Sequence, residues 1–229
     1  MLRKTLFTVV LTFLAFNLNA AQARNYELVD VLTANSLLQG EVRVDIKLYP
    51  GGGILSRLYI GVFDALTIGG AFNTRNIVGT GDIEFVMPPK LLGKFRITSD
   101  EGAVPAIAVG YEGESYMDVG ARGLYFSVTK EMALSSAVFF QLTGSVYTNE
   151  FSRFGSDINL AGGIAFAITR EFTFSIEYDG LFDTDKSHLN FGLGYFFDPI
   201  EIDLGIKYGL GREDIRLGRI LRIIYISYF

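Results

Sequence analysis

Alternation of apolar and polar side chains with a period of two constrains this chain more than any other feature. From Gly40 onward, short segments carry apolar residues at every second position, which is typical of β-strands with two unlike faces. Segment 40–49 is the clearest example. Its even-numbered positions from 42 to 48 are apolar, and its odd-numbered positions from 41 to 47 are charged residues of both signs.

We count twelve such segments along the chain. They cover residues 40–49, 55–63, 66–73, 91–99, 105–112, 121–129, 132–148, 156–169, 172–179, 188–197, 200–210 and 218–229. The tightest connections, at 63–65, 130–131, 169–171 and 198–199, are separated by longer polar or glycine-rich ones. That order fits antiparallel strands with short turns at one end of a barrel and long loops at the other.

Composition indicates what the apolar faces contact. Hydrophobic residues make up 49% of the sequence, with 20 Phe, 12 Tyr and 26 Gly, yet residues 24–229 contain no apolar run long enough for a transmembrane helix. This combination is typical of strands that turn one face to lipid. We therefore predict an all-β fold, a transmembrane antiparallel up-and-down β-barrel over residues 40–229. Twelve strands are expected, and fourteen is the alternative.

The beginning of the sequence resembles a cleaved signal peptide over residues 1–23. It has a short basic start, an apolar stretch over 6–18 and a small-residue cleavage site at Ala21 and Ala23. Residues 24–39 follow, and we expect them to form a periplasmic leader or a short helix at the barrel mouth.

The last strand carries an aromatic-rich stripe at alternate positions, which includes Tyr225 and ends on Phe229. We interpret this stripe as an insertion signal that the barrel-assembly machinery recognises. Together with the signal peptide it predicts a location in the bacterial outer membrane, whose lipid would then be the main partner.

Residues 74–90 are ambiguous. Asp82 to Val86 could form a strand, but Pro88 and Pro89 lack backbone donors, and a lipid-exposed ladder cannot leave such positions unpaired. We therefore expect 74–90 to be a long outer loop, with the lumen as one place that it could occupy.

If the apolar faces contact lipid, the opposite faces line the lumen and bring charged residues of both signs together. They are Glu41, Arg43, Asp45, Lys47, Arg57, Lys94, Arg96, Glu177, Asp179, Glu201, Asp203, Lys207 and Arg222. They could form a constriction that selects solutes, or an internal ion-pair network that holds a narrow barrel together. Closure of the barrel beside strand 40–49 would let Arg222 meet Glu41 or Asp45. Other inward positions are Gly and Ala, which leaves room for water, a loop or the leader.

Several function classes find little support in the sequence. The formal net charge of −5 argues against nucleic-acid binding, and the absence of Cys excludes disulfides and thiolate metal sites. The single histidine, His188, has no serine tied to it by spacing, so we expect no enzyme; an outer-membrane lipid hydrolase is the third hypothesis. No cofactor is expected.

Segment 58–69, with residues 33–35 and 40–41 upstream and 94–96 and 105–111 downstream, resembles the opening hairpins of bacterial outer-membrane barrels, in particular the YjbH-type barrels. That resemblance implies a link to exopolysaccharide export. The first hypothesis for the whole barrel is a narrow passive channel or an accessory to envelope export. The second is a structural or adhesive barrel with a plugged lumen and functional outer loops.

Overall fold

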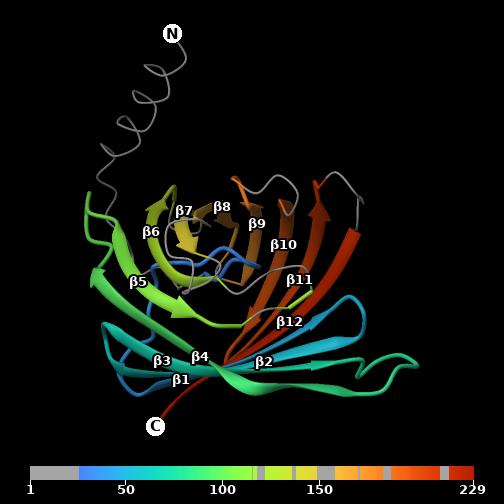
Figure 1. Cartoon of the computed structure of the whole chain (residues 1–229). Coiled ribbons are helices and arrows are strands. Elements are labelled where there is room, and N and C mark those ends of the chain that lie inside the picture. The colour runs from blue at the N-terminus through green and yellow to red at the C-terminus, as the bar shows by residue number, and fades with distance from the viewer. Residues whose placement is uncertain are drawn as a thin grey trace.

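The computed structural model shows a single closed β-barrel (Figure 1). It describes residues 26–114, 116–117, 122–135, 138–148, 158–169, 171–182, 187–211 and 217–229. The strands are β1 (Glu41–Tyr49), β2 (Gly53–Phe63), β3 (Leu66–Arg75), β4 (Glu84–Thr98), β5 (Ala106–Glu112), β6 (Gly123–Ala133), β7 (Phe139–Thr148), β8 (Ile158–Ala167), β9 (Phe172–Asp179), β10 (His188–Phe197), β11 (Ile200–Gly209) and β12 (Leu217–Tyr228).

Every strand pairs antiparallel with its neighbours in sequence, and β12 closes the ring against β1. The prediction of a twelve-stranded up-and-down barrel is therefore confirmed. Closure brings the chain end back to the start of the barrel, where the Phe229 amide donates to the Gly40 carbonyl at 3.0 Å. Both ends of the barrel sequence lie at the same rim, as an even number of strands requires.

The two faces of the strands are as different as the alternation predicts. Large apolar side chains are exposed on the outer surface of the ring, among them Leu58, Phe126, Leu142, Leu193 and Leu204. The inner surface instead carries buried charged, hydroxyl and small side chains. An apolar exterior around a polar interior, with every edge paired, is the architecture of a barrel that crosses an outer membrane. No helix among the described residues is long and apolar enough to span a bilayer.

The expectation of a long outer loop over 74–90 is wrong for most of that stretch. β3 runs to Arg75 and β4 begins at Glu84, and the two strands pair on both sides of an irregularity in the ladder. Pro88 and Pro89 lie inside that irregularity, between the pairs Ala71↔Lys90 and Asn73↔Val86. A bulge leaves residues unpaired, so it accommodates prolines that a regular ladder would not. Only residues 76–83 connect the two strands.

The expected turn at Lys130 and Glu131 is also wrong. Both residues lie within β6 and pair with Leu142 and Gln141, so the β6–β7 connection falls at 134–138. The predicted signal peptide with Ala21 and Ala23 lies outside the described residues, as does the whole of the predicted outer loop 149–155.

Residues 26–39 form neither a helix nor an extended periplasmic segment. They lie inside the ring of strands, where Figure 1 shows the first described part of the chain in blue. Most of these residues are buried, and Thr33 and Ala34 have no exposed surface. We call residues 26–39 the lumen segment. Its position makes the interior of the barrel the place to look for function.

Candidate functional site: the filled lumen

The lumen segment enters the barrel from the rim that also holds the chain end, and it bends back toward that rim. Near the rim, the Leu37 amide donates to the Thr67 hydroxyl at 3.0 Å. Deeper inside, the Ala34 amide donates to the Thr129 hydroxyl at 2.8 Å. The segment then returns, and its Tyr26 carbonyl accepts from the Gln141 amide at 3.2 Å, close to the β6–β7 turn. The segment is therefore a loop with Asp30 near its innermost point.

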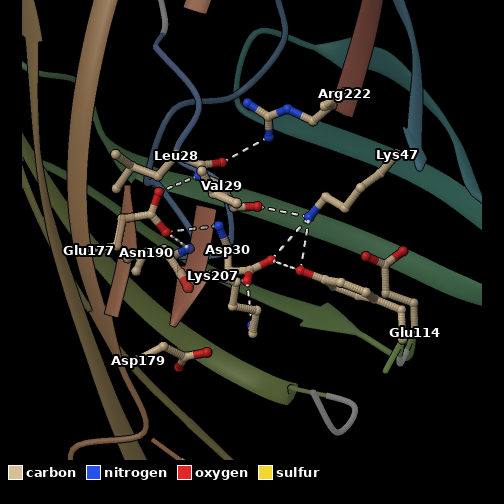
Figure 2. A network of polar contacts seen from close by, with 12 residues as sticks. Leu28, Val29, Asp30, Lys47, Glu114, Glu177, Asp179, Asn190, Lys207 and Arg222 are labelled. Atoms are coloured by element: carbon tan, nitrogen blue, oxygen red, sulfur yellow. Dashed lines mark hydrogen bonds and ion pairs between the residues drawn. The ribbon is translucent and has the colours of Figure 1, made fainter. Parts of the chain in front are cut away.

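The Asp30 carboxylate is the centre of a buried polar network (Figure 2). One oxygen accepts from Lys47 Nζ at 3.0 Å and from the Tyr116 hydroxyl. The other accepts from Lys207 Nζ at 2.7 Å and from Asn190 Nδ2 at 3.3 Å. These donors come from β1, β11, β10 and the β5–β6 connection, so one carboxylate of the lumen segment joins widely separated parts of the wall.

A second carboxylate, Glu177 of β9, grips the backbone of the same loop. Its oxygens accept from the amides of Val29, Asp30 and Val31, with the last two at 2.8 and 3.1 Å. Three consecutive buried amides therefore depend on one side chain of the wall. Since a buried amide without a partner costs about 1–3 kcal/mol, Glu177 determines the path of the backbone here.

Further charged residues of the wall bind both the lumen segment and each other. Arg222 donates to Asp203 at 2.8 Å and to the Leu28 carbonyl at 2.8 Å. Arg43 forms an ion pair with Glu27 at 2.6 Å. Most charges in the lumen are thus paired, which is what burial of charge requires.

A second segment enters the lumen from the opposite rim. In the connection from β5 to β6, Glu114, Tyr116 and Arg122 are buried. Arg122 holds Asp179 through two contacts of 2.9 and 2.7 Å. The Tyr116 ring lies under Lys47 Nζ, 4.6 Å from the ring centroid, while its hydroxyl reaches Asp30. We call the described residues 113, 114, 116 and 117 the entry loop; it meets the lumen segment at the Asp30 network.

Apolar packing completes the seat of the lumen segment. Ala34 packs against Ala106 and Ala108 of β5. Leu28 and Val31 pack among Tyr125, Tyr147, Ala161 and Ala165. A Cβ on Gly163 would lie 2.8 Å from the Leu28 side chain, so the small residues of the wall provide the space that the segment occupies. The sequence suggested such room and left its occupant open among water, a loop and the leader.

Little free space remains beside the lumen segment. The cavity between it and the wall measures about 80 Å³ and is lined by charged residues of β1, β2, β4 and β12. The lumen segment itself, with Glu27, Asp30 and Thr33, forms part of the lining of this cavity.

Electrostatics hold the acidic groups of the lumen segment in their ionised form. Burial alone would raise the pKa of Asp30, but the ammonium groups of Lys207 and Lys47 outweigh it and hold the pKa well below its usual value. Burial likewise opposes ionisation of Glu27, yet Arg43 and Lys94 lower its pKa to about 2. The segment therefore carries two negative charges into a wall that supplies the matching positive ones.

Glu114 of the entry loop behaves in the opposite way. Burial raises its pKa to about 7, although Arg57 lies 3.0 Å away. Arg57 also contacts Asp45 at 2.8 Å and Glu112 at 3.6 Å, so one guanidinium is shared among three carboxylates. That crowding leaves Glu114 poorly compensated.

The charged residues that the sequence placed on the inner face lie mainly inside the barrel. Those that are buried are Glu41, Asp45, Lys47, Arg57, Glu177, Asp179, Glu201, Asp203, Lys207 and Arg222. Arg43 is nearly buried, with 11% of its side chain exposed, and Lys94 donates to the Asn35 carbonyl at 2.8 Å.

Two expectations for single residues differ from the structure. Arg96 lies at the rim, where it donates to the Asp64 carbonyl of the β2–β3 turn at 2.8 Å, and it takes no part in the central network. Arg222 is indeed next to β1, but its ion pair is with Asp203 of β11 and not with Glu41 or Asp45. The register puts Arg222 opposite Lys47, which directs its guanidinium toward the other neighbouring strand.

Sequence reasoning missed Asp30, Glu112, Glu114, Tyr116 and Arg122. Glu112 shares the inward parity of Ala106 and Ala108, so the alternation could have identified it. Asp30 and Tyr116 lie outside strands, where no alternation indicates a direction. Arg122 shares the parity of the lipid-facing Leu124 and Phe126, and the left-handed Gly123 at φ 58° interrupts that parity.

Comparisons with known proteins add the following. Neither the scan against protein-family models nor the search of curated proteins finds a match. Among solved structures, the chain is similar to the KdgM porin, with 14% identity over 82% of this chain and 99% of that chain and a TM-score of 0.49. It is similar to an outer membrane channel from Pseudomonas putida F1, with 11% identity over 89% of this chain and 100% of that chain and a TM-score of 0.48. A NanC porin structure shows 13% identity over 82% and 99%, with a TM-score of 0.42.

Proposed function

We propose that this protein is an outer-membrane channel that its own residues 26–39 close, and that conducts solutes passively once this lumen segment is displaced. The observation that carries the proposal is the way in which the segment is bound. It is held by noncovalent polar contacts to side chains of the wall, with Asp30, Glu27 and the backbone of 29–31 as the main points of attachment. Such contacts can be exchanged for water in an open, hydrated lumen.

The charged wall supports the same proposal. A barrel that stayed filled would gain more from apolar side chains, because replacing buried ion pairs by packed apolar groups is often neutral or stabilising. Here Lys47 and Lys207 both point at one group of the lumen segment and would face water in its absence. A polar lumen is the property that solute passage requires.

A permanently plugged barrel with functional outer loops is the second candidate. The specific observation in its favour is the close fit of the lumen segment, which leaves a cavity of about 80 Å³. An accessory role in envelope export, which the YjbH-type resemblance implies, would require the same displacement as a channel does. We propose no catalytic role, and among the described residues there is no group of His, Cys, Asp or Glu side chains that could hold a metal ion.

A reversible cross-link separates the first two candidates. Ala34 and Ala108 belong to one buried cluster, and the chain contains no native cysteine, so Ala34→Cys and Ala108→Cys together introduce the only thiols. Oxidation should lock the lumen segment in place and abolish conductance in planar bilayers. Reduction should restore the conductance of the unmodified protein.

Each single cysteine variant serves as the control, because it cannot form the cross-link and should be insensitive to oxidation. If neither the unmodified protein nor the reduced variant conducts at any voltage or salt concentration, the channel proposal is wrong and the plugged barrel takes its place.

A further inference from the structure

We propose that the seat of the Asp30 carboxylate is a binding site for a carboxylate-bearing solute, which replaces Asp30 when the lumen segment leaves. This inference rests on the proposed channel function and names the chemical class of its solute. Four donors converge on the seat: Nζ of Lys47 and Lys207, the Tyr116 hydroxyl and the Asn190 amide.

All four donors belong to parts of the molecule other than the lumen segment. Lys47, Asn190 and Lys207 stand on β1, β10 and β11, whose positions are fixed by ladder pairing, and Tyr116 stands on the entry loop. Departure of the lumen segment therefore removes the carboxylate but leaves the strand-borne donors in place. A preformed set of donors binds a matching ligand without the cost of assembling the site.

The arrangement selects for a carboxylate among small ligands. Two ammonium groups on opposite oxygens require negative charge, and each oxygen also accepts from one neutral donor, so both oxygens are fully engaged. A neutral amide of the same shape would present an NH₂ group to Lys207 or Lys47. A cation would meet two like charges.

Charge balance links solute binding to opening. The neighbouring cations Arg57, Arg122 and Arg222 already have partners on the wall, namely Asp45, Asp179 and Asp203. When Asp30 leaves, Lys47 and Lys207 lose the one acid that they share. A carboxylate that enters the barrel restores the balance, so it competes with Asp30 for the same donors and favours displacement of the lumen segment.

The test uses the purified full chain folded in detergent, with acetate as the carboxylate and acetamide as its neutral analogue. Ionic strength is kept constant with sodium chloride. Asp30→Ala empties the seat, and acetate in tenfold excess over its dissociation constant should raise the unfolding temperature of this variant by roughly 3–6 °C. The unmodified protein, with its seat occupied, should show no such stabilisation, and acetamide should stabilise neither.

Two control variants make the result specific. Asp30→Asn fills the seat with an amide and should not respond to acetate. Asp30→Ala combined with Lys47→Met lacks one ammonium donor and should lose the acetate response. An equal shift with acetamide, or an acetate shift that survives Lys47→Met, would overturn the assignment.

A second measurement does not require the Asp30 variant to fold. The side chain of Ala34 is buried against Ala106 and Ala108 of the wall, so the reaction of an Ala34→Cys variant with maleimide reports displacement of the lumen segment. Acetate should increase the labelling rate at least twofold at constant ionic strength, and acetamide should leave it unchanged. Equal labelling rates in acetate and in chloride would show that acetate does not replace the Asp30 carboxylate. An acetate response in a protein that never conducts would keep the carboxylate site and reject the channel, whereas conductance without any acetate response would do the reverse.

Discussion

Two segments fill this barrel from opposite rims, and they are bound by opposite electrostatic arrangements. The lumen segment contributes Asp30 and Glu27, whose pKa values are lowered because cations of the wall surround them. The entry loop contributes Glu114, whose pKa is raised to about 7 because burial and neighbouring carboxylates outweigh its single arginine. The negative charges of the lumen segment are therefore well compensated by nearby cations, whereas the negative charge of the entry loop is poorly compensated. The difference indicates that pH acts on the two ends of the lumen with opposite sign.

Acidification should produce the largest difference between the two segments, because it should release the lumen segment from the wall. A carboxyl whose pKa is lowered in the bound state stabilises binding above its ordinary pKa, and that contribution is lost as the pH falls through the lowered value. The part of the attachment that Glu27 and Asp30 supply should thus weaken as the pH falls below about 4. Hydrogen exchange at the amides of residues 29–31, corrected for intrinsic pH dependence, measures this release.

The double variant Glu27→Gln with Asp30→Asn is the matched control for acidification. It lacks both titrating groups, so its exchange at residues 29–31 should already be fast at pH 7 and should change little on acidification. If acidification reduced the hydrogen-exchange protection of residues 29–31 equally in the double variant and the unmodified protein, the titrating groups would belong to the wall and not to the lumen segment.

Glu177→Ala should weaken the attachment of the lumen segment to the wall, with the second-largest expected effect. It removes the acceptor of three consecutive buried amides, so the docked state should lose about 3 kcal/mol or more. Maleimide labelling of an added Ala34→Cys should rise by two orders of magnitude or more. Arg75→Ala is the control, since it breaks only the Arg75–Glu84 pair, in which both side chains are more than half exposed, and it should not alter labelling.

Ala108→Leu should weaken the attachment of the lumen segment by an intermediate amount. Its effect is steric and does not involve charge. Ala108 has no exposed surface and packs on Ala34, so the larger side chain should strain this contact by about 1–3 kcal/mol. Exchange at the amide of Ala34 should accelerate at every pH, while the pH dependence at residues 29–31 should keep its shape. Val109→Leu, on the lipid side of the same strand, should leave both unchanged.

Glu114→Gln should produce the smallest change, with the opposite pH dependence. Because the docked entry loop favours the protonated form of Glu114, its docking is strongest below pH 4.5 and weakens as the pH rises through about 7. The neutral glutamine should thus protect the entry loop slightly better than Glu114 at pH 8 and equally well at pH 5. Reduced protection of Gly113 or Tyr116 at pH 8 in the variant would contradict the poorly compensated state of Glu114.

The alternation of residues determined the barrel, and it did so through a local rule. Successive side chains of a strand point to opposite sides, so a run such as Val42 to Leu48 specifies an apolar and a charged face without knowledge of any partner. The same rule placed Asp45, Lys47, Glu177 and Lys207 inside. It failed where the backbone leaves the regular ladder, at the proline-containing bulge of β4 and at the start of β6.

The contents of the lumen were decided by the tertiary structure alone. Asp30 lies in a segment without periodicity, and its partners stand 17 to 177 residues away along the chain. No local pattern links an acid at position 30 to lysines at 47 and 207, because only closure of β12 on β1 brings their strands around a common axis. The sequence thus defines which faces meet lipid, since that depends on neighbouring residues, whereas the ring closure defines which charges meet each other.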